Sequence, residues 1–243
     1  HLMSANIPNC ISYDPTYAYE LAVIIHDGLR RMYANDENIF YYITIMNENY
    51  AHPALPPDAS EGIVKGMYLL SEAEAPGGKA KRVQLMGCGT ILREVIAAAD
   101  LLREFDVYAD IWSATSFTEL RREGQDVERW NMLHPDEHPR ESFVSQSLGA
   151  HGGPVIAASD YTRLFADQIR PYVNRRFVAL GTDGYGRSDV RAKLREFFEV
   201  DRRYVAVAAL KALADEGDIE RSVVAEAIKK FDIDVSRPNP MTV

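Results

Sequence analysis

The clearest pattern of apolar and polar positions lies in residues 82–105, where an apolar run leads through Gly87-Cys88-Gly89 into an amphipathic segment. Apolar residues in that segment recur every three or four positions, which is the spacing of one buried helix face. A second apolar run, residues 107–114, follows at once. This order predicts a strand, a crossover helix and a second strand parallel to the first. The positions expected to be buried on the helix are Leu92, Val95, Ile96, Ala99 and Leu102.

Later apolar runs extend this pattern, because parallel strands need crossover helices on the faces of their sheet. Residues 154–159 and 176–180 are each predicted to form a buried strand. Residues 67–74 are expected to form an antiparallel edge, pairing with residues 82–86 across a loop at 75–78. We therefore predict an α/β fold with a mostly parallel sheet flanked by helices. Further helices are expected from Asp160, with Tyr161, Leu164, Phe165, Ile169 and Tyr172 facing inward, and over residues 190–198, 202–216 and 220–231.

Residues 1–46 form a smaller unit of the same kind. Residues 9–13 predict a short strand, and the β-branched and aromatic run at 39–46 predicts a second, buried strand. Between them, Asp14 is expected to be the N-cap of a helix, with Pro15 at its first position. This unit is too small to be a domain, so we expect it to be the tail of one in a longer protein. Its helix is expected to bury Leu21, Ile24, Ile25, Gly28, Leu29 and Met32.

Residues 47–60 are rich in Pro, Asn and Asp and lack an apolar period, which is typical of a connection between domains. We place the boundary here, with an incomplete domain over residues 1–56 and a second domain over residues 57–243. Within the second domain, residues 115–143 are expected to form a polar and aromatic connection with a short helix at 127–132.

Composition and charge argue against several classes of function. Apolar residues make up 47% of the chain and charged residues 26%, as in ordinary globular proteins. The net charge of −9, with Lys and Arg scattered among acids, argues against nucleic-acid binding. No run approaches the roughly 18 apolar residues of a membrane span. Cys10 and Cys88 are expected to be reduced thiols. We therefore expect a cytoplasmic protein without a membrane or nucleic-acid partner.

Two glycine-rich segments have the composition of phosphate-binding turns at helix N-termini. Gly87-Cys88-Gly89 lacks the third glycine of the dinucleotide fingerprint, because Leu92 stands at that position. The segment GTDGYG, residues 181–186, follows a predicted strand, where α/β sheets commonly bind ligands. A tight turn explains both segments equally simply and is favoured here. In that interpretation, Ser188 caps the next helix.

Three other groups of reactive residues have structural explanations. The segment HPDEH, residues 134–138, contains metal ligands, but Pro135 and a loop setting remove the helical spacing of a zinc pair. No His or acid lies at a sequence spacing from Cys88 that is typical of an activated thiol. A buried, unreactive thiol is therefore favoured over a nucleophile. His26 falls off the apolar stripe and is expected on the helix surface. These residues alone assign no reaction.

Longer motifs add a resemblance that spacing alone does not give. They are IPNCISYDP at residues 7–15, YAYE at 17–20, YYIT at 41–44, NENY at 47–50, TSFTEL at 115–120, GQD at 124–126, ERWNMLHP at 128–135 and GTDGYGRSD at 181–189. Together they resemble the homodimeric pyruvate dehydrogenase family, the thiamine-diphosphate-dependent first component of the pyruvate dehydrogenase complex. The similarity runs nearly end to end and fails in the loops at 75–81 and 148–153.

The resemblance implies a parent enzyme with three α/β domains in each subunit. In that comparison, residues 1–56 are the end of the pyrimidine-binding domain and residues 57–243 are the transketolase-like C-terminal domain. The parent would decarboxylate pyruvate on thiamine diphosphate, held with Mg²⁺, and pass the acetyl group to a lipoyl group. The sequence lacks the Gly-Asp-Gly…Asn motif for the diphosphate and Mg²⁺. The activating glutamate and the active-site histidines would precede His1.

We therefore expect this chain alone to be inactive and to bind neither thiamine diphosphate nor Mg²⁺. Its expected role is architectural, in a homodimer whose parent enzyme serves the lipoyl acyltransferase of the complex. No residue is assigned to catalysis, cofactor or metal. A free-standing phosphate- or nucleotide-binding α/β module is the alternative function.

Two sets of candidate site residues follow from position in the resembled family. Residues after the strand at 39–46 line the substrate channel in related transketolases, although a polar boundary loop explains them equally well. Residues of the segment 115–133 lie near subunit contacts in the family, although they could also cover the chain's own sheet. The channel candidates are Asn47, Glu48, Asn49 and Tyr50, and the interface candidates are Phe117, Trp130 and Met132.

Overall fold

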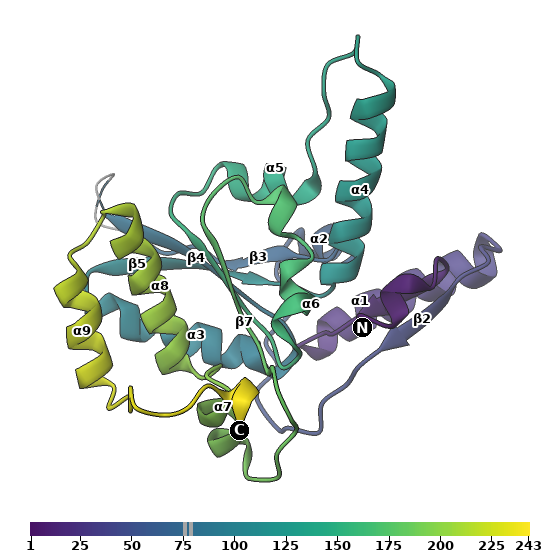
Figure 1. Ribbon diagram of the computed structural model, residues 1–243. Coiled ribbons are helices and arrows are strands. Elements are labelled where there is room, and N and C mark those ends of the chain that lie inside the picture. Colours follow the sequence, from purple (N-terminus) through teal and green to yellow (C-terminus); the bar gives the residue numbers. More distant parts are fainter. Residues whose placement is uncertain (75–76, 78–79) are drawn as a thin grey trace.

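The main body of the protein is a five-stranded sheet with helices on both faces (Figure 1). The computed structural model describes residues 1–74, 77 and 80–243. The strand order is β3-β5-β4-β6-β7, and all neighbours are parallel except β3 and β5. The predicted α/β class is therefore confirmed. The strands are β3 (Tyr68–Ser71), β4 (Lys81–Gly87), β5 (Val107–Ser113), β6 (Val155–Ala158) and β7 (Phe177–Leu180).

The central strand β4 separates two apolar cores. Val83 and Leu85 belong to the core on one face, whereas Met86 belongs to the core on the other. This alternation is the geometry of a strand that is buried on both faces. The first face carries α3 (Leu92–Arg103), α7 (Arg191–Phe197), α8 (Arg202–Glu216) and α9 (Arg221–Lys230). The second carries α4 (Phe117–Leu133), α5 (Phe143–Gly149) and α6 (Arg163–Asp167).

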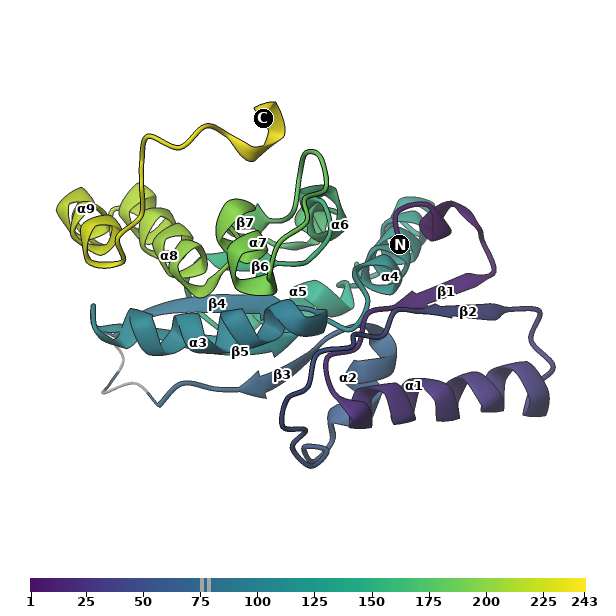
Figure 2. The ribbon, with the colours of Figure 1, turned by 90° about the horizontal axis from the view of Figure 1, so that it is seen from below.

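Residues 1–56, the N-terminal lobe, form a two-stranded parallel sheet with α1 beside it (Figure 2). Ile11 and Ile24 of this lobe share a core with Ile63 and Tyr68 of residues 57–243, the C-terminal lobe. The two lobes are therefore joined by common apolar packing. The elements of the N-terminal lobe are β1 (Cys10–Tyr13), α1 (Ala18–Leu29), a π-helical turn (Arg30–Ala34) and β2 (Phe40–Ile43), and the C-terminal lobe begins with α2 (Ala59–Lys65). Short 3-10 turns span Ser4–Asn6, Gly89–Ile91, Arg170–Tyr172 and Pro240–Thr242.

The edge strand β3 is antiparallel as predicted, but its partner is different. Tyr68 lies opposite Ser113 of β5, and β3 does not pair with residues 82–86. Those residues belong to β4, whose two sides are already taken by β5 and β6. A hydrophobic pattern can predict that a segment forms an edge strand, but it does not determine which strand it pairs with. The predicted loop at 75–78 lies mostly outside the described residues.

The strand predicted at residues 39–46 is shorter and more exposed than expected. β2 covers Phe40–Ile43, and the side chains of Phe40 and Tyr42 are 46% and 44% exposed. In the described chain β2 pairs with β1 alone. Ile25 and Leu29, both expected in the buried stripe of α1, are also about half exposed. An apolar pattern predicts burial against a complete neighbouring layer of structure. This two-stranded sheet is too small to cover all of these apolar side chains.

The long connection predicted at residues 115–143 contains a 17-residue helix, α4, in place of a short one. Ser116 is its N-cap, and the Ser116 hydroxyl accepts a hydrogen bond from the Glu119 amide at 3.0 Å. Ser followed three residues later by Glu is a helix-start signal. The missed part is the first half of α4, residues 117–126, where acids and arginines leave only a weak apolar period. That composition is why the helix was predicted too short.

Three predicted helix starts were also wrong. α1 begins at Ala18 after the N-cap Tyr17, so Asp14 is not a cap. The helix expected from Asp160 is limited to α6 and the following 3-10 turn, and Leu164 is 64% exposed. The N-cap of α7 is Val190, with no side-chain cap from Ser188.

Within the described part of the chain, none of the helices combines the length and the apolar character needed to span a bilayer.

Candidate functional site

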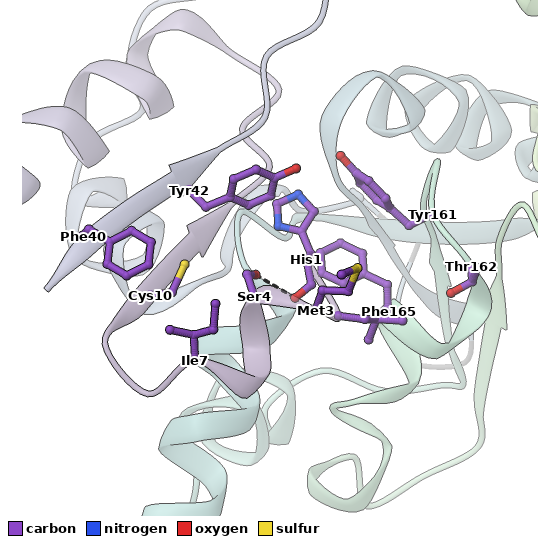
Figure 3. A pocket seen from close by; sticks show the side chains of 11 residues that line it. His1, Met3, Ser4, Ile7, Cys10, Phe40, Tyr42, Tyr161, Thr162 and Phe165 are labelled. Carbon is purple, nitrogen blue, oxygen red and sulfur yellow. Dashed lines mark hydrogen bonds between the residues drawn. The ribbon is translucent and has the colours of Figure 1, made fainter.

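A cavity of about 520 Å³ lies where the two lobes meet. Figure 3 shows its walls, which come from the start of the chain, from β1 and β2, and from the beginning of α6. The walls are mainly apolar and aromatic, as in small-molecule sites. We call this space the junction cavity. Its lining residues are His1, Leu2, Met3, Ser4, Ile7, Cys10, Phe40, Tyr42, Tyr161, Thr162 and Phe165.

The His1 imidazole is surrounded by three aromatic rings (Figure 3). It stacks on Phe165 with ring centres 4.9 Å apart and meets Tyr161 and Tyr42 edge-on at 4.8 and 5.1 Å. Its Nε2 atom lies 3.0 Å from the Thr44 hydroxyl. The His1 ring is therefore held by contacts from both lobes.

Asp14 lies behind Thr44 and is 1% exposed. Its Oδ1 atom accepts hydrogen bonds from the hydroxyls of Thr44 at 2.6 Å and Tyr161 at 3.3 Å. The Oδ2 atom is buried without a hydrogen-bond partner. Burial raises the pKa of the Asp14 carboxyl to about 6, against the hydrogen bonds that favour the charged form. Among the residues that the structure describes, hydroxyl groups and not cations donate to this carboxyl.

The fold explains why these groups meet. Asp14 follows β1, Thr44 follows β2 and Tyr161 lies just after β6, so each stands at the carboxyl end of a parallel strand. Backbone bonds fix this arrangement, since the Thr44 amide donates to the Tyr13 carbonyl and the Asp14 amide to the Thr115 carbonyl. The carboxyl ends of parallel strands are the usual ligand-binding edge of α/β sheets. Here the edges of both sheets contribute.

The turn Gly87-Cys88-Gly89 packs against Asp14. A Cβ atom on Gly89, which has φ of +49°, would lie 2.6 Å from the Asp14 Oδ2 atom. A Cβ on Gly87 would lie 2.8 Å from the Leu92 Cα atom. Close packing therefore requires glycine at both positions. The interpretation as a tight turn fits this geometry, and burial also raises the pKa of the Cys88 thiol.

Glu20 is a second buried acid, and its environment differs from that of Asp14. Its Oε2 atom accepts from the amides of Thr16 at 2.5 Å and Tyr17 at 2.9 Å. Its Oε1 atom accepts from the hydroxyls of Tyr68 at 2.7 Å and Ser113 at 2.6 Å. Four donors from three elements satisfy both oxygens. Glu20 therefore links the start of α1 to β3 and β5.

The channel candidates lie outside the junction cavity, and Glu48 is tied to the C-terminal lobe. The Glu48 carboxylate is 2.7 Å from the guanidinium of Arg93 and 2.6 Å from that of Arg195. Arg191 lies 3.6 Å away and also donates to the Asn47 side chain. Three arginines thus surround one carboxylate. This geometry links the two lobes electrostatically.

Tyr50 is half-buried and Asn49 is exposed. The Tyr50 hydroxyl donates to the Thr16 carbonyl, and the Arg93 guanidinium lies 4.7 Å from the centre of the Tyr50 ring. The His52 ring stacks on Tyr50 at 4.8 Å. These contacts give residues 47–52 an ordered place against the C-terminal lobe. A role in a substrate channel stays a prediction.

The interface candidates are separated by the structure. Phe117 is fully buried in the core beneath α4, so it cannot contact a partner. Trp130 lies between His134, with ring centres 4.4 Å apart, and the Arg140 guanidinium at 3.7 Å. Met132 is 71% exposed, on the end of α4 that projects from the body (Figure 1). Only Trp130 and Met132 remain candidates for an interface.

One cluster of metal-type side chains is found among the described residues, formed by Glu72, Asp110 and His151. Asp110 already receives the Arg82 guanidinium at 2.9 Å and His151 Nδ1 at 3.1 Å. The side-chain amide of Gln84 lies 2.8 Å away on the same carboxylate. The Arg82 guanidinium therefore already compensates the charge of the Asp110 carboxylate. The cluster is a polar network that fastens the loop around His151 to the sheet.

The residues around the junction cavity have no functional role predicted from the sequence. His1 has no role predicted from the sequence, and Asp14 is predicted to be a helix cap. Thr44 was treated as part of a buried strand and Tyr161 as an inward-facing helix residue. One signal was present in the sequence, because Asp14 and Tyr161 follow the strands predicted at residues 9–13 and 154–159. The pairing of two separate sheets at one edge was not visible in any single segment.

Comparison with known proteins places the chain in a family. The family model described as the transketolase-like TK C-terminal domain matches residues 66–201, more than half of the chain. The chain therefore belongs to this family. A second model, for the middle domain of the pyruvate dehydrogenase E1 component, matches residues 1–53. The predicted resemblance is confirmed by the "Pyruvate dehydrogenase E1 component" of Cupriavidus necator, which is 62% identical over 244 residues. That match covers 100% of this chain and 27% of the relative, so the chain spans about a quarter of its length.

Solved structures agree with the fold. A transketolase from Campylobacter jejuni matches with a TM-score of 0.58 and 15% identity, over 86% of this chain and 27% of that chain. A structure titled "Split gene transketolase, inactive beta4 tetramer" matches with a TM-score of 0.53 and 16% identity, over 87% of this chain and 60% of that one. At these identities the likeness shows a shared fold only.

Proposed function

We propose that this chain works as part of a pyruvate dehydrogenase E1 component. That enzyme would decarboxylate pyruvate on thiamine diphosphate and transfer the acetyl group to a lipoyl group. The observation that carries the proposal is the 62% identity with the Cupriavidus necator E1 component along the whole chain. The two family models, in the order middle domain and then C-terminal domain, support it.

The role of the chain itself is architectural. Apolar packing, the donors around Glu20 and the arginines around Glu48 hold the N-terminal lobe against the C-terminal lobe. In the complete enzyme these contacts would give the end of the middle domain a rigid support. The channel role of Asn47, Glu48, Asn49 and Tyr50 is kept within this proposal. Binding of substrate would then be transmitted to the C-terminal lobe through the arginines on Glu48.

Neither the junction cavity nor the cluster at Asp110 fits thiamine diphosphate and Mg²⁺. Neither Lys nor Arg lines the junction cavity, so nothing there would neutralise a diphosphate. The metal-type cluster at Asp110 is occupied by Arg82. When bound in the complete enzyme, thiamine diphosphate would supply the electron sink for decarboxylation. The groups that hold it would come from other parts of that enzyme.

Calorimetry tests this assignment. Titrating thiamine diphosphate with Mg²⁺ into the chain is expected to give no saturable binding, and pyruvate is expected to stay intact. Inorganic phosphate is the second titrant, because it distinguishes a free-standing phosphate-binding module. Saturable binding of the cofactor would overturn the architectural role. Binding of phosphate alone would favour the module.

We further propose a homodimer as the working state, with the lipoyl acyltransferase as a partner of the complete enzyme and the cytoplasm as its location. The exposed Met132 and Leu133 at the end of α4 support self-association, because exposed apolar side chains beside polar ones are typical of interfaces. Trp130, fixed by His134 and Arg140, would give this surface a rigid base.

A further inference from the structure

We propose that the C-terminal lobe contains a binding site for a carboxylate group, built from Arg93, Arg191 and Arg195. In the native chain the N-terminal lobe fills this site with the side chain of Glu48. A free carboxylate of the size of acetate is the ligand that takes its place when that side chain is removed. This inference does not rest on the proposed function, because the stability and binding of the chain itself test it.

The site lies where the winding of the main sheet changes direction. From β4 the chain passes through α3 to β5 on one side, whereas from β6 it passes through α6 to β7 on the other. Open α/β sheets bind ligands in the crevice between two such strands, at their carboxyl ends. A cavity of about 80 Å³ lies there, bordered by residues that follow β4 and β6 and by α7. Its lining residues are Met46, Thr90, Asp160, Arg191, Leu194 and Arg195.

The three arginines come from two helices of the C-terminal lobe and converge on one carboxylate. Arg93 belongs to α3, whereas Arg191 and Arg195 are about one turn apart on α7 and share a helix face. The Glu48 Oε1 atom lies 2.7 Å from the Arg93 guanidinium. The Oε2 atom lies 2.6 Å from Arg195 and 3.6 Å from Arg191. Guanidinium groups on both oxygens are a typical means of recognising a carboxylate.

The C-terminal lobe also holds Arg195 in place by contacts of its own. The Arg195 Nη1 atom lies 3.3 Å from the Glu94 carboxylate. The guanidinium and the backbone amide of Arg202 hold that carboxylate in turn, at 2.9 and 3.1 Å. The Arg195 side chain is only 11% exposed, so few other positions are open to it. The site is therefore preorganised, which reduces the cost of binding an anion.

The arginines depend on Glu48 for their counter-charge. Arg93 and Arg191 form ion pairs with Glu48 alone in the described part of the chain. Asp160, the acid in the cavity lining, forms no ion pair with a described residue. Removing one partner from a partly buried ion pair is costly, because the other charge is left uncompensated. Loss of the Glu48 side chain would therefore leave a space that favours another carboxylate.

Glu48→Ala tests the site, because the atoms that it removes are those of acetate. We expect acetate to raise the melting temperature of this variant well beyond its effect on the native chain. The apparent dissociation constant for acetate is expected to be about tenfold lower in the variant, or less, because the native site is open in a tenth of molecules or fewer. Sodium chloride at equal ionic strength controls for screening, and acetamide controls for shape without charge.

Glu119→Ala is the matched control. The Glu119 side chain is 18% exposed and that of Glu48 16%, but the carboxylate of Glu119 pairs with one arginine, Arg122, at 2.8 Å. Arg122 also donates to the carbonyls of Cys10 and Ile7, so the loss of Glu119 leaves it with partners. We expect acetate to affect this variant and the native chain equally.

Adding Arg93→Gln to Glu48→Ala locates the bound acetate. Arg93 is 39% exposed, so its replacement leaves the core intact. We expect the affinity for acetate to fall by about tenfold, as the loss of one charged hydrogen bond allows. An unchanged affinity would place the acetate elsewhere and overturn the proposal. Equal responses of Glu48→Ala to acetate, chloride and acetamide would also overturn it. So would a Glu48→Ala chain that stays unfolded in acetate, since acetate supplies every atom that was removed.

Discussion

At the scale of single residues, two buried acids of the N-terminal lobe show how donors decide the behaviour of a carboxyl group. Glu20 receives four hydrogen bonds over its two oxygens, two of them from backbone amides. Asp14 receives two, both from hydroxyls and both on one oxygen. The charge of Asp14 is therefore poorly compensated. Its raised pKa has a direct consequence for stability.

We expect the substitution Asp14→Asn to stabilise the protein increasingly as the pH rises. The carboxyl pKa is 3.8 before folding and about 6 after it. Because the folded pKa is raised, this group favours the native state below about pH 3.8 and loses that contribution as the pH rises through 6. The shift corresponds to on the order of 3 kcal/mol. Urea denaturation of both proteins measures it, and a difference that does not vary with pH would contradict it.

We expect Gly89→Ala to destabilise the protein by at least about 2 kcal/mol, because the residue combines a positive φ with a close approach to Asp14. Gly149→Ala is the matched control, since Gly149 ends a helix and a Cβ there meets nothing within 4 Å. The control is expected to change stability by less than about 1 kcal/mol. Equal effects of the two substitutions in thermal unfolding would show that Gly89 is not constrained.

At the scale of elements, β2 is the least supported strand of the structure. It pairs with β1 alone, and two of its four side chains are 44–46% exposed. Two-stranded sheets are marginal in water. By contrast, β4 has a partner on each side and buried residues on both faces.

We therefore expect amide exchange to show β2 opening first and β4 last. Residues 40–43 should lose protection before β1, because β1 is also held by bonds from the Arg122 guanidinium to the carbonyls of Cys10 and Ile7. The protection of β4 is expected to approach the free energy of global unfolding. Equal protection of β2 and β4 would mean that the two lobes unfold as one unit.

The end of α4 carries the proposed interface, and Met132→Glu tests it. Met132 is 71% exposed, so the substitution leaves the packing of the chain intact. We expect the dissociation constant of the dimer to rise by about tenfold or more, because a charge would be buried in the contact. Sedimentation over micromolar concentrations measures it.

Trp130→Ala is a useful comparison for that experiment. Trp130 contacts His134 and Arg140, which follow α4 in the chain, so its loss would also loosen the packing at the end of α4. We expect it to weaken the dimer together with the thermal stability, whereas Met132→Glu changes association alone. A chain that stays monomeric in its native form and in both variants would sink the interface proposal.

The elements of the C-terminal lobe could be predicted from sequence where one stretch carried the whole signal. β4, α3 and β5 follow from alternating and helical apolar periods within residues 82–113. α4 was predicted too short because arginines and acids dilute its period, although Ser116 and Glu119 marked its start. The partner of β3 was missed because pairing depends on a competition between strands. No local pattern records that competition.

At the scale of the whole molecule, the candidate site could not be predicted because it exists only between elements. His1, Asp14, Thr44 and Tyr161 are separated by up to 160 residues, and only the junction of two sheets brings them together. The resemblance to pyruvate dehydrogenase predicted the family correctly, but the site residues that it indicated were residues 47–50. Asn47, Glu48 and Tyr50 contact arginines of the C-terminal lobe, and the role of residues 47–50 in a channel is still a prediction.

The central claim is that this chain acts only when the rest of a pyruvate dehydrogenase E1 component completes it. Reconstitution tests it most directly, by mixing the chain with the part of the Cupriavidus necator relative that it does not match. Release of carbon dioxide from pyruvate is measured with thiamine diphosphate and Mg²⁺. We expect no activity from either part alone and cofactor-dependent activity from the mixture. Activity of the chain alone, or a stable but inactive assembly of the two parts, would contradict the account.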